Sequence, residues 1–89
     1  MEIIVKRLSE EEIAKMGIRQ WPIWEKEPSR FEWTYDSQEE CLFLEGEVIV
    51  HAPDGRQVKI HAGDYVIFPT GLSCTWQVLK QVRKHYRFQ

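Results

Sequence analysis

Apolar and polar residues alternate one by one in several short stretches of this chain, a period of two that is typical of strands with one buried face. Phe31, Trp33 and Tyr35, for example, are separated by single polar residues. Turn residues recur at intervals of about ten residues, which favours an antiparallel barrel or sandwich over a parallel sheet. The pattern predicts roughly eight or nine short strands, at residues 3–5, 18–24, 31–35, 41–44, 47–52, 57–61, 65–68, 73–79 and 84–88.

Glycine and proline mark the ends of these stretches. Asp54-Gly55 beside Pro53 is a strong signal for a hairpin. Pro22 predicts an edge strand, or an irregular strand broken at the proline, because it cannot donate a hydrogen bond to a sheet. Gly46 is predicted to end the strand that precedes it. Further turns or loops are predicted at residues 25–30, 36–40, 62–64 and 69–71.

One short helix interrupts the strand pattern near the beginning of the chain. Ser9 and Glu12 have the spacing of a capping box, in which a hydroxyl and a carboxylate each accept a hydrogen bond from a free backbone amide. Ile13 and Met16 then form an apolar stripe. Gly17 is predicted to end the helix in the left-handed conformation.

Length and composition narrow the class of protein. The chain has 89 residues, of which 43% are hydrophobic and 29% charged, so we expect one folded domain spanning residues 1–89. A domain this small buries a modest fraction of its surface. We therefore expect a homodimer, with the edge around Pro22 as a natural place for the second copy.

Charge and hydropathy exclude several partners. The net charge is −2, and basic residues are interleaved with acidic ones, so we expect no nucleic-acid partner. The longest apolar runs are far shorter than a membrane span of about 20 residues, and the residues after Met1 lack the pattern that would predict a signal peptide. We expect a cytoplasmic protein with no membrane partner. Cys41 and Cys74 are accordingly interpreted as free thiols.

Two spaced motifs resemble those of the cupins. Glu39 is followed by six residues and Gly46, like the end of the first cupin motif. Gly63 is followed by five residues, then Pro69-Thr70-Gly71, two residues and Cys74, like the second. The resemblance covers roughly residues 31–79 and implies an all-β fold, a small antiparallel conical barrel of the jelly-roll type with one short N-terminal helix.

A longer pattern extends the resemblance to most of the chain. Trp-Pro-Ile-Trp from Trp21, Cys-x-x-Leu-Glu-Gly from Cys41 and Val-Arg-Lys-His-Tyr up to Tyr86 are similar to short single-domain cupins grouped with the cupin domain of ureidoglycine aminohydrolase. This group is mainly of unassigned function.

The metal ligands of cupins are missing at the matching positions. Cupin metal sites use three histidines and one glutamate, which together suit an open transition-metal site. Trp33 and Tyr35 stand where the first two histidines belong, Cys74 stands where the third belongs, and only Glu39 remains. We therefore expect no metal and no other cofactor. An atypical metal site made by Glu39, Cys41 and Cys74 is an alternative, because strand alternation puts Cys41 on the face of Glu39.

The candidate site residues follow from this comparison. Glu39, inside a barrel lined by aromatic residues, is a candidate acid or base because desolvation shifts the pKa of a carboxylate. Alternatively, Glu39 has only a structural role, in which its carboxylate is hydrogen-bonded to Tyr35 or Trp76. Cys74 is a candidate nucleophile or soft ligand, with a role as a small buried hydrophobe as its alternative. The candidate ligand-binding residues are Trp33, Tyr35, Glu39, Cys74 and Trp76.

The remaining aromatic and histidine residues have simpler interpretations. Trp21, Trp24 and Phe31 belong to an aromatic group that either stacks a planar ligand in the barrel mouth or fills the core or a dimer face. No histidine stands at a cupin ligand position. His51 and His61 are predicted to face solvent, and His85, among Arg83, Lys84 and Arg87, is predicted to lie on a solvated basic edge.

Three functions remain open from the sequence. The first is a metal-independent cupin that binds a small molecule. The second is an enzyme resembling ureidoglycine aminohydrolase that acts on a small nitrogenous metabolite, with an atypical metal site or none. The third is a scaffold whose barrel is filled by its own aromatic residues.

Overall fold

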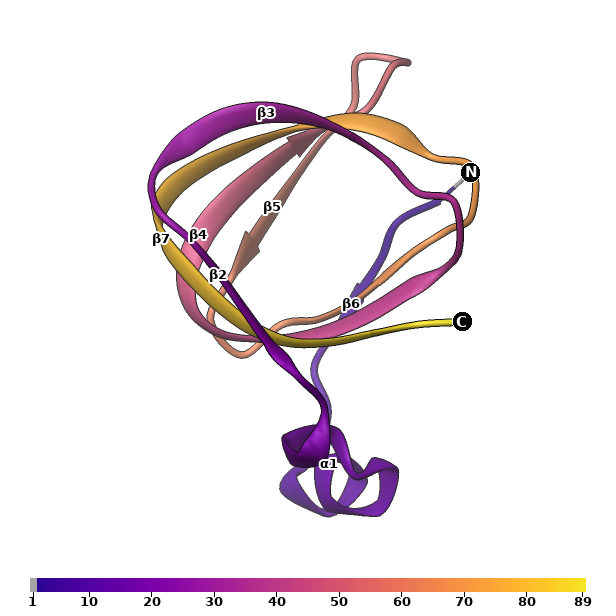
Figure 1. Ribbon diagram of the computed structural model, residues 1–89, viewed down its shortest axis with the longest axis vertical. Coiled ribbons are helices and arrows are strands. Elements are labelled where there is room, and N and C mark those ends of the chain that lie inside the picture. Colours follow the sequence, from indigo (N-terminus) through magenta and orange to yellow (C-terminus); the bar gives the residue numbers. More distant parts are fainter. Residues whose placement is uncertain (1) are drawn as a thin grey trace.

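The computed structural model describes residues 2–89, and seven strands of this part of the chain curl into a barrel (Figure 1). The hydrogen-bonded order is β1-β6-β4-β7-β2, with β3 added to β7 and β5 added to β4, and every pairing is antiparallel. The strands are β1 (Ile4–Lys6), β2 (Ile23–Lys26), β3 (Ser29–Thr34), β4 (Glu39–His51), β5 (Gln57–His61), β6 (Tyr65–Phe68) and β7 (Ser73–Phe88).

Two long strands, β4 and β7, give the barrel its shape. They pair with each other over most of their length, from Glu39 with Phe88 to His51 with Thr75. Each bends, so that β4 pairs with β6 at its start and with β5 at its end, while β7 pairs with β3 and then with β2. The predicted small antiparallel barrel of the cupin, jelly-roll type is confirmed.

The prediction that glycine ends a strand at residue 46 is wrong. Residues 41–44 and 47–52 were predicted as separate strands, but they lie in one strand, β4. Gly46 has φ +105°, and the register between β4 and β7 shifts around it. An irregularity of this kind bends a strand without ending it, because pairing resumes on both sides. Residues 73–79 and 84–88 are likewise one strand, β7, opposite the same irregularity.

The region around Pro22 also differs from the prediction. Residues 18–24 were predicted as one irregular strand, but Ile18–Gln20 form a 3₁₀ turn, η1, and β2 begins only after the proline. The predicted loop at residues 25–30 is much shorter, because β2 and β3 leave only Glu27 and Pro28 between them. Both strands gain their hydrogen bonds from β7, a partner that the local sequence does not reveal.

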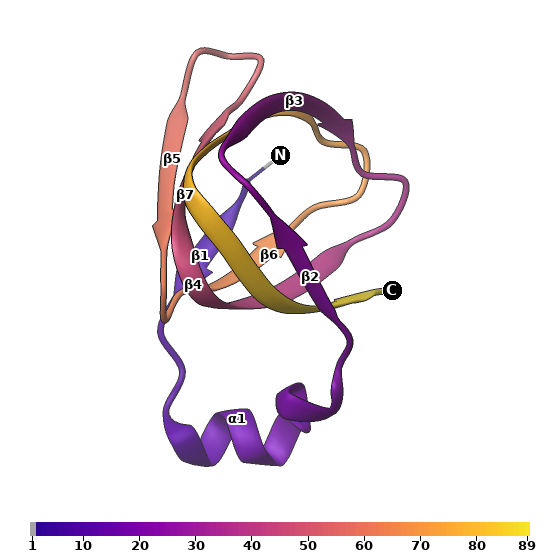
Figure 2. The same ribbon diagram turned by 60° about the vertical axis from the view of Figure 1, so that its left-hand side comes forward.

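The predicted helix is confirmed in detail. In α1 (Glu10–Met16) the Ser9 hydroxyl accepts a hydrogen bond from the Glu12 amide at 3.1 Å, and the Glu12 carboxylate accepts one from the Ser9 amide at 2.9 Å. Gly17 ends the helix at φ +67°. Figure 2 shows α1 outside the barrel at one end, where Ile13 packs in a small cluster with Leu42.

The main core lies inside the barrel, between the inward faces of its strands. Its buried residues are Tyr35, Cys41, Phe43, Val48, Val50, Ile60, Val66, Phe68, Leu72, Cys74, Trp76, Val78 and Val82. Aromatic rings gather on one side of this core, where β2, β3 and β7 meet, and that side borders the cavity described below. Over residues 2–89, no helix has both the length and the apolar character needed to cross a membrane.

Candidate functional site

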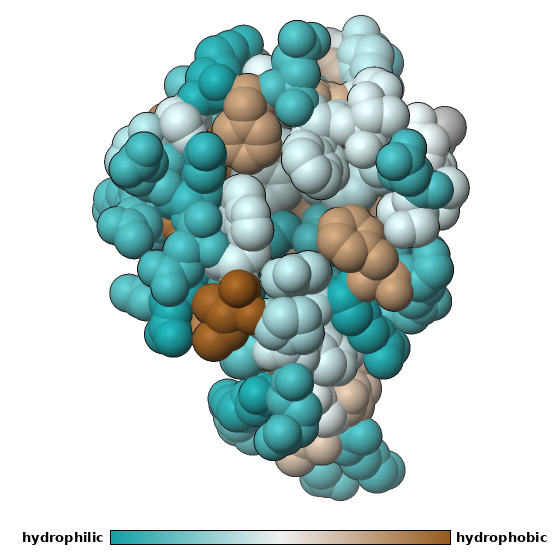
Figure 3. Space-filling model, viewed as in Figure 1, coloured by the Kyte–Doolittle hydropathy of each residue, from teal (hydrophilic) through white to brown (hydrophobic). Residues whose placement is uncertain are grey.

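A cavity of about 230 Å³ opens inside the barrel. Figure 3 looks onto this face, where separate apolar side chains surround a small hollow in a mostly polar surface. The wall comes from β2, β3, β4 and β7 and from the turn that follows β3. The lining residues are Trp24, Phe31, Trp33, Tyr35, Glu39, Trp76, Lys84, Tyr86 and Phe88.

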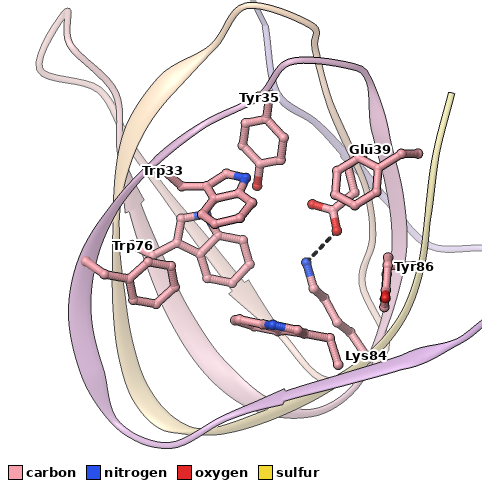
Figure 4. Close-up of a pocket in the computed structure, with 9 residues that line it drawn as sticks. Trp33, Tyr35, Glu39, Trp76, Lys84 and Tyr86 are labelled. Atoms are coloured by element: carbon pink, nitrogen blue, oxygen red, sulfur yellow. Dashed lines mark hydrogen bonds and ion pairs between the residues drawn. The ribbon is translucent and has the colours of Figure 1, made fainter.

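A buried ion pair forms part of this wall (Figure 4). Lys84 Nζ donates a hydrogen bond of 2.9 Å to Glu39 Oε2, and the two side chains are only 4% and 5% exposed. Glu39 begins β4, and Lys84 lies near the end of the neighbouring β7. The prediction that Lys84 belongs to a solvated basic edge is therefore wrong.

The aromatic rings form a cage around the ammonium group of Lys84. Its nitrogen lies 4.7 Å from the ring centre of Trp76 and 5.0 Å from that of Trp24. Phe43 and Phe68 follow at 5.6 and 5.8 Å. Ring faces within about 6 Å attract a cation. The cage and Glu39 together hold a positive charge that would otherwise be costly to bury.

Tyr35 supplies a second polar group to the cavity. Its ring stacks on Phe68 at 4.9 Å, and Figure 4 shows its hydroxyl pointing into the cavity. Burial, followed by the negative charge of Glu39 nearby, raises the pKa of Tyr35 far above its usual value. The hydroxyl group is therefore a neutral donor at physiological pH.

The indole of Trp76 lies against this hydroxyl. It lowers the pKa of Tyr35 and of Cys74, but the larger effect of burial raises both. Its buried Nε1 nevertheless completes no hydrogen bond of normal geometry with any described residue. A buried indole N–H without an acceptor is uncommon, because its lost hydration is not replaced.

Trp33 lies at the rim of the cavity and not in its interior. Alternation predicts that it shares the buried face of Tyr35, but Trp33 is 47% exposed and Tyr35 only 1%. The difference lies in their surroundings: the Tyr35 amide donates to the Leu72 carbonyl and its ring packs in the core, whereas Trp33 borders the opening of the cavity. Their rings still meet edge to face at 6.4 Å.

The two cysteines do not line this cavity. Cys41 is fully buried, and its thiol donates to the Val66 carbonyl at 3.6 Å. Cys74, paired with Trp33 in the sheet, borders a separate shallow depression near His51. Burial is the main cause that raises the pKa of Cys41 to about 12 and that of Cys74 to about 11. Both groups are therefore thiols and not thiolates.

We expect both thiols to be inert in the folded protein. With a pKa raised to about 11 for Cys74 and about 12 for Cys41, the thiolate fraction near neutral pH falls about a hundredfold or more below that of an ordinary cysteine. Reaction with a disulfide reagent at pH 8 should be slower than in guanidinium chloride by at least that factor. A thiol that reacts rapidly in the native protein would restore Cys74 as a candidate nucleophile.

The histidines lie away from the cavity. His51 is partly buried and bonds to Gln77 at 2.9 Å, whereas His61 is exposed. His85 is buried and pairs with the backbone carbonyl of Trp21 at 2.9 Å, so the prediction of a solvated position for His85 is wrong. It instead fixes η1 to β7.

A second buried carboxylate, Glu40, holds the end of β7. Burial opposes its ionisation, but hydrogen bonds from Tyr65, Arg87 and Gln89 and the charge of Arg87 outweigh this, and the pKa of Glu40 is lowered. These bonds fasten the residues on either side of Phe88, one wall of the cavity. Glu40 therefore has a structural role beside the site.

The side chains present do not fit the metal site of cupins. In the part of the chain that the structure describes, no three His, Cys, Asp or Glu side chains converge to hold a metal ion. The ammonium group of Lys84 takes the place of a cation beside Glu39. Glu39, Cys41 and Cys74 do not form the atypical site considered from the sequence, because neither thiol lines the cavity with Glu39.

The structure therefore brings together four of the five predicted binding residues: Trp33, Tyr35, Glu39 and Trp76. Lys84, Tyr86 and Phe88 also line the cavity, although none of them was predicted as a site residue. A signal was present, because these three residues and the buried Val82 recur at every second position of β7 and share one face.

Several solved structures share this fold. The chain matches a putative ethanolamine utilization protein Q from Salmonella typhimurium LT2 at 22% identity and a TM-score of 0.67, over 99% of this chain and 69% of that one. It matches the EutQ protein of Clostridium difficile at 21% and 0.68, over 97% and 66%. At these identities the likeness shows the fold alone. A comparison with curated proteins found no match.

A much nearer relative is a DUF861 family protein from Thermotoga maritima. The two chains are 45% identical, with a TM-score of 0.97, over 99% of this chain and 100% of that one. The sequence profile of the EutQ-like cupin domain matches residues 13–86. This range contains every residue of the cavity wall except Phe88. The chain therefore belongs to the family of EutQ-like cupin domains.

Proposed function

We propose that this chain is a metal-independent binding protein for a small organic molecule, which it holds in the cavity beside Glu39 and Lys84. The observation that carries this proposal is a buried ion pair in the wall of a cavity that the protein's own side chains leave open. Pockets of this kind, mostly apolar with a few convergent polar groups, are the usual form of a small-molecule site.

The ion pair supports a role beyond stability. Taking two charges out of water costs several kcal/mol, and well-packed apolar residues often stabilise a core as well or better. Lys84 and Glu39 are placed where a bound molecule could contact both. Recognition of a ligand is a reason to retain a pair that stability alone does not require.

The size and walls of the cavity indicate the kind of molecule. About 230 Å³ corresponds to roughly eight water molecules at their share of liquid volume, which suits a molecule of metabolite size. Six of the lining residues besides Tyr35 are aromatic, and Trp33 stands half exposed at the rim. Stacking on aromatic side chains favours a planar ligand.

A planar probe tests the proposal. Indole, titrated into ¹⁵N-labelled protein, is expected to shift the indole N–H signals of Trp76 and Trp33 and the amides of β3 and the end of β7. Trp33→Ala should weaken binding about fivefold, the value of one aromatic contact. Leu79→Ala is the matched control, since Leu79 is 41% exposed and lies outside the cavity wall, and it should bind as the wild type does.

The opposite results would favour a different function. If indole shifts no cavity signal, or if both alanine variants behave alike, the barrel is a scaffold filled by its own aromatic residues. The proposal would then be withdrawn.

A second candidate is an enzyme similar to ureidoglycine aminohydrolase. The observation in its favour is that a carboxylate and an ammonium group, the two partners of a general acid–base pair, lie together at a cavity wall. Incubation with ureidoglycine, with release of ammonia as the readout and elemental analysis of the same protein, tests it. Turnover by the wild-type protein that is lost in Glu39→Gln would favour this enzymatic function over the binding function.

A further inference from the structure

The net charge of the cavity wall is zero. Among the described residues, Glu39 and Lys84 are the only acidic and basic groups in its wall, and each neutralises the other across 2.9 Å. A charged ligand would find one attracting and one repelling group side by side. It would lose its hydration on entry, with no net charge in the wall to compensate the loss.

The pair nevertheless keeps free hydrogen-bonding capacity. An ammonium group has three donors, and within residues 2–89 Lys84 makes one hydrogen bond, to Glu39 Oε2 at 2.9 Å. The other carboxylate oxygen, Oε1, accepts no hydrogen bond from the described residues, and Figure 4 shows the carboxylate directed into the cavity. The pair can therefore donate one hydrogen bond and accept another at the same time.

Tyr35 adds a second donor beside this acceptor. Its raised pKa keeps the hydroxyl protonated, and in residues 2–89 no acceptor takes the hydroxyl proton. The neighbouring Trp76 indole is itself a donor. Figure 4 shows the Tyr35 hydroxyl and the Glu39 carboxylate pointing toward the same space.

We propose, as an extension of the binding function above, that the cavity selects a neutral, planar molecule whose polar head carries both an acceptor and a donor, as an amide group does. The carbonyl oxygen of such a head accepts from Lys84 and Tyr35, and its N–H donates to Glu39 Oε1. The planar body of the ligand stacks among the aromatic rings that lie between these polar groups and Trp33 at the rim.

Three probes of one shape separate neutral from charged ligands. Benzamide is neutral, benzoate is an anion and benzamidine is a cation, and all three carry the same ring. We expect benzamide to bind the wild-type protein about tenfold more tightly than either ion, because a site without net charge does not compensate the lost hydration of an ion. The readout is the dissociation constant from ¹⁵N chemical-shift titrations at pH 7.

Two single variants should reverse this selectivity. Glu39→Gln leaves the positive charge of Lys84 without its partner and should make benzoate the preferred probe. Lys84→Met leaves the negative charge and should make benzamidine the preferred probe. The matched controls are Glu45→Gln and Lys80→Met, which change exposed charges outside the cavity wall and should keep the wild-type order.

The double variant Glu39→Gln/Lys84→Met keeps the experiment decisive if a single variant fails to fold. Its cavity wall carries no charge, so benzamide should remain the preferred probe, as in the wild type, because an uncharged wall does not compensate the lost hydration of an ion. Benzamide should bind it more weakly than the wild type, because the ammonium donor and the carboxylate acceptor are gone, and an equal affinity for benzamide would contradict the inference.

The results distinguish the two proposals. If benzoate or benzamidine binds the wild type best at the cavity residues, the cavity binds ligands but the inference on ligand class is wrong. If indole binds there and benzamide does not, the inference is also wrong and the binding function stands. If none of the four molecules shifts a cavity signal, both proposals fail.

Discussion

Lys84→Met is expected to destabilise the protein by about 3–5 kcal/mol, because it leaves the Glu39 carboxylate buried without its counter-ion. The carboxylate is 5% exposed, and Lys84 supplies the one hydrogen bond that it accepts within residues 2–89. For a domain of this size, each kcal/mol lowers the melting temperature by about 4–8 °C. Thermal and urea unfolding followed by circular dichroism measure the loss.

The double variant separates the ion pair from simple packing. Glu39→Gln/Lys84→Met removes both charges and keeps similar volumes, so its stability should return to within about 1–2 kcal/mol of the wild type. Lys80→Met, at an exposed position that contacts Glu47, should change stability by no more than about 0.5 kcal/mol. A double variant as unstable as Lys84→Met would show that lost packing around the aromatic cage, and not the unpaired charge, causes the effect.

Gly46→Ala is expected to have the second large effect, a loss of about 3 kcal/mol or more, since it combines backbone strain with a steric clash. Gly46 has φ +105°, a conformation that residues with a side chain rarely adopt. A Cβ atom there would lie 2.7 Å from Val82 Cα and still closer to the Gln81 carbonyl oxygen, both in the backbone of β7. Backbone atoms of a paired strand cannot move aside without breaking the sheet.

A second glycine isolates the clash from the strain. Gly55, in the β4–β5 hairpin, has φ +90°, but no atom lies within 4 Å of its Cβ position. Gly55→Ala should therefore cost only the strain, about 1–2 kcal/mol. Equal losses in urea unfolding of the two variants would mean that the close approach of β4 and β7 at Gly46 relaxes, and that the bend does not depend on it.

Local chemistry made much of the fold predictable from the sequence. The capping box of Ser9 and Glu12 and the terminating Gly17 act within one turn of chain, and α1 has these bounds. The hairpin at Asp54-Gly55 and the short strands β5 and β6 follow from turn residues and alternation within a few positions. The two spaced motifs that resemble cupins lie on β4 and around β6, and the barrel agrees with them.

Long-range pairing decided what the local pattern could not. The sequence divides β4 and β7 at residues 46 and 80–83, but in the structure the two strands support each other across the irregularity. The partners of β2 and β3 both lie on β7, 56 to 62 residues away along the chain for β2 and 39 to 49 for β3. A strand end is therefore a property of its neighbours as much as of its own residues.

In the candidate site, too, some features follow from the local sequence and others only from the tertiary structure. The sequence alone determined that the histidines of a cupin metal site are absent and that Glu39, Tyr35, Trp33 and Trp76 belong together, because motif spacing and alternation place them. Only the tertiary structure brought Lys84 beside Glu39 and separated Cys74 from the cavity. In the sequence, Lys84 stands among other basic residues and has the pattern of a residue exposed to solvent. Its burial depends on the aromatic cage and the Glu39 carboxylate, which come from β2, β4, β6 and β7. That combination exists only once the barrel has closed.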